Sequence, residues 1–210
     1  MLSMRISRKI GTVLAALILC LWLPVPAAQA EETAGATVER LNAALIGVMQ
    51  EAEALGYQGR YDRLAPDLEA VFDFPAMARA ALGRHWRTAS AEEQAAFTEA
   101  FTAFSIAVFA DRFDGYSGER FEVTGEQPAR RGTVLVRNQL VKTDGEIIAI
   151  DYLARPDRTG GGWRLIDTFL EAKYSEIAAR RSEYSSIVQN QGLDALITAL
   201  KDKMAGYAVP

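Results

Sequence analysis

The spacing of the hydrophobic residues changes twice along this chain of 210 residues, and this limits the possible folds more than any other feature. From Val38 to about Gly115, apolar side chains recur at steps of three and four, the repeat of an amphipathic helix. Over residues 121–170 the repeat shortens to two, as in β-strands, and from Tyr174 it is helical again. The order predicts an α+β protein whose antiparallel sheet is curved around helices or covered by them on one face.

The first helical region, residues 34–115, is divided by glycine and proline. Its first helix has one apolar face and is predicted to close at Gly56, because glycine favours the end of a helix. A second helical stretch is expected to follow Pro66, since proline suits the first turn of a helix. A short third helix is predicted over residues 74–82.

A capping box marks the start of a long helix. The side chain of Ser90 can accept a bond from the backbone of Glu93, whose carboxylate returns one. The helix is predicted to run from there to about Gly115. Its apolar face carries aromatic residues at steps of four and three, namely Phe97, Phe101 and Phe104, followed by Val108.

The sheet is predicted as a meander within residues 119–171. Hairpin turns are expected at Asp144-Gly145 and at the glycine run 160–162. The four expected strands are residues 121–124, 133–142, 146–154 and 163–170. Two further helices, separated by Gly192, are predicted within residues 173–206.

The first 30 residues have the features of a secretory signal peptide. A positively charged start precedes the apolar run Ile10–Leu23, and Ala28-Gln29-Ala30 supplies small residues at the cleavage positions. We expect cleavage after Ala30, export, and one mature domain over residues 31–210. The run is too short to favour a retained membrane anchor.

The mature chain is expected to be acidic and free of cysteine. The lone cysteine, Cys20, lies inside the apolar run, so disulfides and thiol chemistry are excluded after cleavage. Three of the 23 basic residues also precede Ala30, which leaves 20 basic and 27 acidic residues and a net charge of −7. This balance argues against nucleic acid and against broad adsorption to anionic membranes.

Few kinds of enzyme site are compatible with these residues. His85 is the only histidine, and neither the zinc motifs, the nucleophile elbow nor a glycine-rich phosphate loop occurs. We therefore predict no catalytic residue, no metal site and no cofactor. His85 itself is interpreted as a structural residue that caps carbonyls or packs on an aromatic ring, with a catalytic or phosphate-contacting role as the alternative.

Two acids interrupt otherwise apolar strands. If their strands pair, Asp151 and Asp167 come close across the sheet, which would raise one pKa and could supply a general acid or base, with Tyr152 beside them. The simpler interpretation is that these carboxylates bond to arginines such as Arg137 or Arg155, or to loop amides.

Aromatic residues are concentrated between Phe72 and Tyr116. The strand 146–154 is apolar on both faces, which predicts a sheet covered on both sides, with helices on one side and a cavity on the other. The pattern leaves open whether these residues form a solid core or line that cavity.

Residues 72–97, FDFPAMARAALGRHWRTASAEEQAAF, resemble the MlaC or toluene-tolerance auxiliary family, including its hopanoid-associated HpnM branch. That family shows the pattern FD-F-x-x-M-A-x-x-x-L-G-x-x-W-x-x-A-[ST]-x-x-[EQ]-Q-x-x-F. The stretches GGWRLIDTFLE (161–171) and RRSEYSSIVQNQGLDALITAL (180–200) resemble its later signatures. His85 departs from the family, where an aromatic residue such as tyrosine is common, which puts a headgroup role for that position in doubt.

The resemblance implies an NTF2-like curved sheet packed with helices around an apolar cavity for acyl chains. It implies a periplasmic, non-enzymatic carrier that shuttles lipid between an outer-membrane lipoprotein complex and an inner-membrane MCE-type ABC transporter, and so maintains lipid asymmetry. The cargo would be phospholipid, or a hopanoid as in the HpnM branch. An NTF2-like enzyme using Asp151 or Asp167 and an adaptor with a solid interior are the alternatives.

Candidate site residues follow from this cavity. Arg84 and Arg87 are expected near its mouth, beside the lipid headgroup. The expected lipid-binding residues are apolar positions of the third and long helices and of the last two long strands: Phe74, Met77, Leu82, Trp86, Phe97, Phe101, Phe104, Val108, Ile148, Ile150, Tyr152 and Ile166.

Overall fold

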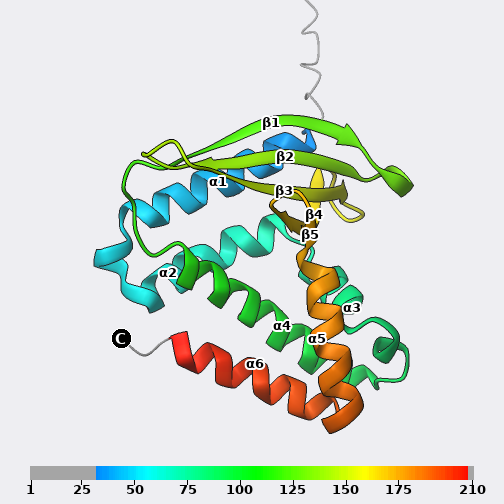
Figure 1. Cartoon of the computed structure of the whole chain (residues 1–210). Helices are drawn as coiled ribbons and strands as arrows, with labels where there is room; N and C mark the ends of the chain where they lie inside the picture. Colours follow the sequence, from blue (N-terminus) through cyan, green and yellow to red (C-terminus); the bar gives the residue numbers. More distant parts are fainter. Residues whose placement is uncertain (1–31, 208–210) are drawn as a thin grey trace, which may run out of the picture. The chain divides into compact units, whose positions relative to one another are not determined.

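The computed structural model describes residues 32–207. The expected signal peptide and its cleavage position after Ala30 lie outside the described residues. Within them, a five-stranded sheet lies over a group of helices (Figure 1). The helices are α1 (Ala34–Gln50), α2 (Ala52–Val71), α3 (Phe74–Leu82), α4 (Ala91–Arg112), α5 (Glu176–Gln191) and α6 (Leu193–Tyr207), with a short 3-10 helix η1 (Gly83–Arg87) after α3.

The sheet is an antiparallel meander in which each strand pairs with the next in sequence. The α+β fold with such a sheet is therefore confirmed. A register shift between Val123 and Gly125 lets the first strand continue to Pro128, beyond the predicted end at Thr124. The strands are β1 (Arg120–Pro128), β2 (Val134–Val141), β3 (Ile147–Pro156), β4 (Trp163–Leu170) and β5 (Tyr174–Ser175). Tyr174, expected to begin a helix, pairs with Leu170 instead.

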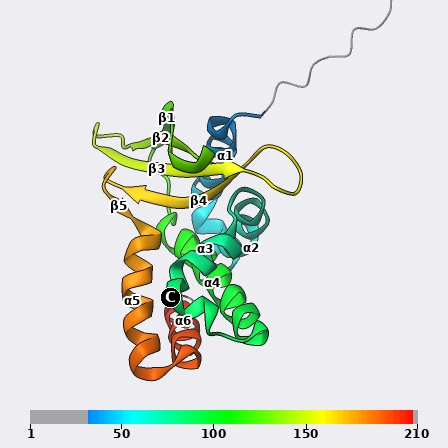
Figure 2. The ribbon, with the colours of Figure 1, turned by 90° about the vertical axis from the view of Figure 1, so that its right-hand side faces the viewer.

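The described helices lie on one face of this sheet (Figures 1 and 2). Val136, Tyr152 and Leu165 project from that face into the same buried cluster as Leu41 and Leu45 of α1. The expectation that β3 is covered on both sides is therefore wrong, and the outer face is partly polar. It carries the ion pair between Arg137 and Asp151, together with Ile147, which is 57% exposed.

Two helix boundaries differ from the prediction. The first helix ends at Gln50 rather than at Gly56, and Gly56 (φ 60°) forms a kink inside α2. Pro66 lies within α2 instead of before a new helix. Proline there removes one bond to the carbonyl of Asp62, but both residues are exposed, so water can satisfy that carbonyl. The long helix α4 has the predicted capping box at Ser90.

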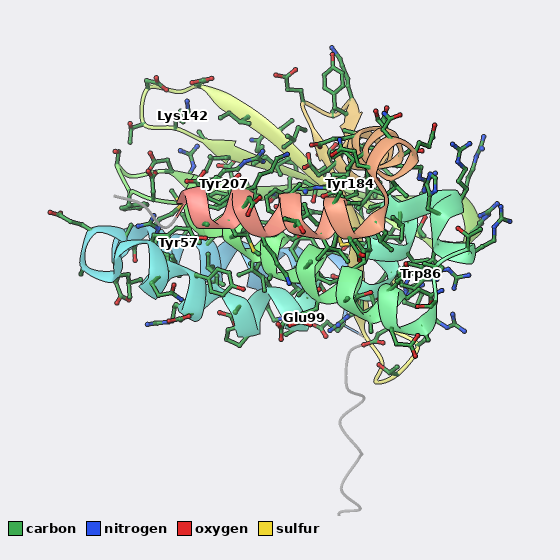
Figure 3. All side chains as sticks on the ribbon, turned by 90° about the horizontal axis from the view of Figure 1, so that it is seen from below. Tyr57, Trp86, Glu99, Lys142, Tyr184 and Tyr207 are labelled. Atoms are coloured by element: carbon green, nitrogen blue, oxygen red, sulfur yellow. The ribbon has the colours of Figure 1, made fainter. Side chains whose placement is uncertain are left out.

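On the side of the helices that faces away from the sheet, α6 packs against α4 and α5 (Figure 1). Seen from the side opposite the sheet, α6 lies across α4, with Tyr184 near one end of α6 and Tyr207 at the other (Figure 3). The ring of Tyr207 stacks on Phe104 of α4 at 6.5 Å between centroids. Tyr184 meets Phe97 edge to face at 6.0 Å. These contacts join the C-terminal helices to α4.

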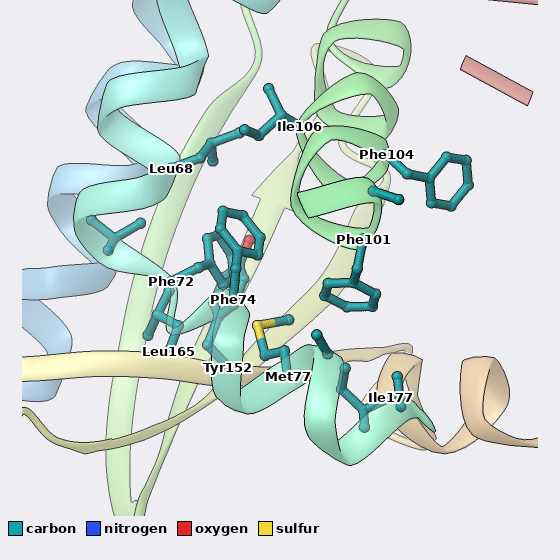
Figure 4. Packing of buried hydrophobic residues seen from close by; sticks show 14 of the residues in the cluster. Leu68, Phe72, Phe74, Met77, Phe101, Phe104, Ile106, Tyr152, Leu165 and Ile177 are labelled. Carbon is teal, nitrogen blue, oxygen red and sulfur yellow. The ribbon is translucent and has the colours of Figure 1, made fainter. Parts of the chain in front are cut away.

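The centre of the core lies where α2, α3, α4 and β3 meet (Figure 4). Phe72 is 1% exposed, and its ring contacts three others. The centroids of Phe74, Phe109 and Tyr152 lie at 5.4, 5.5 and 6.2 Å from it. Aromatic pairs of this kind add about 0.5–1.5 kcal/mol each beyond the burial of their area.

Candidate functional site

An apolar pocket of about 60 Å³ lies between the helix-covered face of β4 and helices α3, α4 and α5. Most of its wall is aromatic or aliphatic, and its polar residues belong to α4, β4 and α5. Its lining comprises Phe72, Phe74, Met77, Phe101, Ser105, Val108, Phe109, Arg112, Thr168, Leu170, Glu176 and Arg180.

Local sequence explains why α3 and α4 supply this wall. Asp73 caps α3 by accepting a bond from the backbone of Ala76, which starts the helix so that Phe74 and Met77 point inward. On α4, Phe101, Ser105 and Val108 recur at steps of four and three and so share one face. Figure 4 shows Phe74, Met77 and Phe101 converging on the same space.

Arg180 is the most deeply placed cation of the pocket, with a side chain only 12% exposed. Its Nη2 lies 2.9 Å from Oε1 of Glu176, and its Nη1 donates to the hydroxyl of Tyr184 at 3.0 Å. Its guanidinium also lies over the ring of Phe104, 4.9 Å from the centroid, a cation–π arrangement. Arg112 adds a second, exposed cation to the lining.

The pKa values around Arg180 show how this charge is kept. Burial alone acts to lower the pKa of Arg180, but Tyr184 and Glu176 outweigh it, so the pKa is raised and the guanidinium stays charged. Burial raises the pKa of the Tyr184 hydroxyl, which remains a neutral acceptor for Arg180. The pocket therefore combines apolar walls with a charged guanidinium that is paired with Glu176.

Four of the twelve expected lipid-binding residues line this pocket: Phe74, Met77, Phe101 and Val108. Others are fully buried in the core outside the lining, namely Leu82, Phe97, Phe104 and Tyr152. Ile148, Ile150 and Ile166 are partly buried strand residues outside it.

Sequence reasoning missed the remaining eight lining residues. Phe72 and Phe109 belong to the aromatic-rich region, so the local concentration of aromatic residues was a usable signal for them. Arg180 lies in the RRSEYSS stretch, but nothing in the local sequence indicates that one of its two adjacent arginines turns inward while Arg181 stays exposed. Ser105 shares the α4 face of Phe101 and Val108, so helical spacing was a usable signal for it. Glu176 joins the pocket because α5 folds back against β4.

The expected headgroup residues Arg84 and Arg87 lie elsewhere. Together with Trp86 they line a separate open groove on the outer side of α3. His85, between them, has its Nε2 3.2 Å from Oγ of Ser185, and its carbonyl accepts bonds from the backbone of Thr88 and Ala89. In the described structure His85 therefore joins η1 to α5, and it is not among the lining residues of the apolar pocket.

The two strand acids are occupied by structural bonds. Asp151 is 3% exposed and accepts bonds from the guanidinium of Arg137 and from the backbone of Asn138 at 3.1 Å. It pairs across the sheet with Phe169, whereas Asp167 pairs with Leu153, so the two acids are not directly opposite.

Asp167 fixes the start of α5. Its carboxylate accepts bonds from Thr168 N, Ser175 Oγ and Ile177 N at 2.8, 2.6 and 3.1 Å. Burial nevertheless raises its pKa, against the effect of those bonds. Neither acid lines the apolar pocket, which leaves the enzyme alternative without a site at that pocket.

Among residues 32–207, no three histidine, cysteine, aspartate or glutamate side chains are grouped closely enough to hold a metal ion. Within the same range, no helix is both long and apolar enough to cross a membrane.

Comparison with solved structures gives a match to the phospholipid-binding protein of Ralstonia solanacearum, which was solved in complex with a phospholipid. The two chains share 19% identity, with 84% of this chain and 99% of the other covered, and the TM-score is 0.73. At this identity the match shows a shared fold. A comparison with curated proteins gives no significant match.

A protein-family comparison covers most of the chain. The family model described as MlaC protein matches residues 39–202, which include every helix and strand described above apart from the first residues of α1 and the last of α6. The chain therefore belongs to the MlaC protein family.

Proposed function

We propose that this protein is a periplasmic, non-enzymatic phospholipid carrier that holds acyl chains in the apolar pocket. It would take lipid from an outer-membrane lipoprotein complex and deliver it to an inner-membrane ABC transporter complex of the MCE type, or the reverse. Membership of the MlaC family and the shared fold with a phospholipid-bound protein support this proposal. The observation that carries it is an aromatic-lined pocket with a buried arginine among its lining residues.

The energetics of lipid tails explain why such a pocket is needed. Burying a methylene group gains about 0.8 kcal/mol, so exposing a chain of roughly sixteen carbons to water costs on the order of 13 kcal/mol. A carrier must therefore enclose the tails, whereas a charged headgroup can remain at the mouth in water. The lining supplies apolar side chains for the tails and arginines for a charged headgroup.

The pocket must widen before acyl chains can enter. Its volume of about 60 Å³ is well below the roughly 300–1,000 Å³ of ordinary ligand cavities. Its wall is shared by separate elements, so displacement of α3 or α5 from β4 enlarges it without breaking any helix. We infer that Phe72, Phe74 and Phe101 change position when acyl chains enter.

The direct test is native mass spectrometry of the mature protein purified from periplasm, followed by solvent extraction of any ligand. We expect a stoichiometric phospholipid. A bound hopanoid would keep the carrier function and change its cargo. An empty protein that also fails to take up lipid from phospholipid vesicles would contradict the proposal and favour the adaptor alternative.

Arg180 is proposed to hold the lipid phosphate. Replacing it by glutamine should weaken phospholipid binding roughly 10- to 100-fold, because a hydrogen bond to a charged group contributes about 1.5–3 kcal/mol. Arg180→Lys should recover part of the loss, since lysine keeps the charge but not the planar fork. Binding can be measured by competition with a fluorescent phospholipid.

A neutral lipid provides the control for this substitution. Diacylglycerol has the same tails but no phosphate, so Arg180→Gln should change its binding little. Equal losses for diacylglycerol and phospholipid would show that Arg180 acts on the shape of the pocket and would contradict the assignment. Thermal unfolding should confirm that each variant is folded.

A further inference from the structure

Seven arginines line one open groove of about 1150 Å³ on the outer side of α3. They come from five separate segments: α3, η1, the β1–β2 connection, the end of β3 with the loop after it, and α5. They are Arg79, Arg84, Arg87, Arg131, Arg155, Arg158 and Arg181. The only acid in the lining is Asp73, which pairs with Arg155. This concentration of positive charge contrasts with the acidic chain as a whole.

Most of these charges are not neutralised within the described residues. Arg155 is the only one of the seven with an ion pair to a described acid. Its Nε is buried and has no hydrogen-bond partner in the described structure. Arg181 donates only to the carbonyl of Ala80, which brings no charge. Packing like charges together without counter-charges is unfavourable, so the groove is suited to an anionic ligand.

The groove extends beyond this set of residues. A second hollow shares Arg155 and Arg158 with it and adds Arg164 together with one acid, Asp157. A third shares Arg181 and continues along α5. The lining of the first groove also includes the apolar residues Pro75, Ala76 and Trp86. Figure 3 shows Trp86 at this end of the structure, among side chains that end in nitrogen. The surface therefore combines guanidinium groups with apolar side chains.

We propose that this groove is the docking site for an acidic, amphipathic segment of a partner protein. Guanidinium groups bind carboxylates in a bidentate manner. The apolar lining residues can contact the hydrophobic side chains of the same segment. The inference rests on the proposed function in one respect: a shuttle must dock reversibly, and charge complementarity speeds association and sets specificity.

The shape and the overall charge favour a protein segment over a membrane surface. The arginines line a hollow, which a protruding peptide can enter, whereas a flat bilayer would contact only the rim. The mature chain also carries a net charge of −7, which repels an extended anionic surface. A short acidic segment meets the local positive field of the groove without that repulsion.

Docking here would contact the helix that forms the lipid pocket. Pro75, Ala76 and Arg79 lie on the groove side of α3, while Phe74 and Met77 of the same helix line the pocket. A partner held in the groove is therefore one helix away from the proposed acyl chains.

The test uses the mature protein and a fluorescein-labelled 16-residue amphipathic peptide with glutamate on its polar face. Fluorescence anisotropy should show binding that weakens as salt is added, and the matched glutamine peptide should not bind. The double variant Arg79→Glu/Arg158→Glu should weaken binding about tenfold or more. The control Arg63→Glu/Arg120→Glu makes the same change in net charge at exposed sites outside the groove and should change binding less than about twofold.

Three outcomes would overturn the proposal. The first is failure of the wild-type protein to bind the glutamate peptide. The second is an equal loss of peptide binding in the groove and control variants, which would mean that net charge alone explains the binding. The third is binding to phosphatidylglycerol vesicles, lost in the groove variant, without binding to the peptide. Native mass spectrometry of the same samples reports lipid occupancy separately, so failure of the groove and failure of the carrier proposal are distinguishable.

Discussion

Replacing Val108 with tryptophan is expected to abolish most phospholipid binding while the protein stays folded. Val108 lies on α4, is partly buried and lines the pocket. An indole at this position fills a space of about 60 Å³ and opposes its widening. Overpacking costs about 1–3 kcal/mol, which a domain of this size can tolerate. We expect at least about a tenfold drop in phospholipid per mole of protein, measured as extracted phosphorus.

Ile147→Trp is the matched control, because it adds a comparable side chain on β3 at a position that is 57% exposed. Its lipid content should equal that of the wild type. If Val108→Trp is folded by circular dichroism and still carries stoichiometric lipid, the acyl chains lie elsewhere, and the pocket assignment is wrong. Loss of lipid in both variants would point to a general effect of tryptophan on purification or stability.

Replacing Phe72 with alanine is expected to cause the largest loss of stability. Phe72 is 1% exposed and contacts Phe74, Phe109 and Tyr152. Removing its ring deletes these contacts and leaves a cavity, which costs about 3–5 kcal/mol. For a domain of this size the melting temperature should fall by about 6–20 °C. Urea unfolding, followed by circular dichroism, measures the free energy directly.

Tyr174→Ala provides the comparison, since Tyr174 is 65% exposed on β5. Its free energy of unfolding should stay within about 0.5 kcal/mol of the wild-type value. A loss below about 1 kcal/mol for Phe72→Ala would mean that the neighbouring rings close the cavity. The pocket wall would then be more deformable than its aromatic packing indicates.

The two predictions address different properties of the same wall. The pocket wall is packed with aromatic rings, so the same side chains stabilise the fold and line the pocket. Ligand binding stabilises the folded state by RT ln(1 + L/Kd), where L is the concentration of free ligand. The Phe72→Ala protein should therefore be compared with the wild type after lipid extraction, so that a difference in occupancy does not add to the difference in packing.

The sequence alone determined the order of the elements and much of one wall of the pocket. Apolar spacing predicted the long helix with its Ser90 cap and the pairing of successive strands, because these depend on interactions between residues close in the chain. The same spacing placed Phe101 and Val108 on one face of α4, whereas Phe74 and Met77 were named only as candidate cavity residues. The change in spacing also distinguished the helical regions from the region that forms the sheet.

Only the tertiary structure decided which faces meet. Arg180 and Arg181 are adjacent, yet Arg180 lines the apolar pocket and Arg181 lines the groove, because α5 packs against both β4 and α3. Arg79 and Arg158 are far apart in sequence and come together only when the β3–β4 loop lies beside α3. Local periodicity reports which side of a helix or strand is apolar, whereas the convergence of charges depends on how distant elements pack. The sequence therefore indicated the fold class and the family, and packing defined the apolar pocket and the arginine groove.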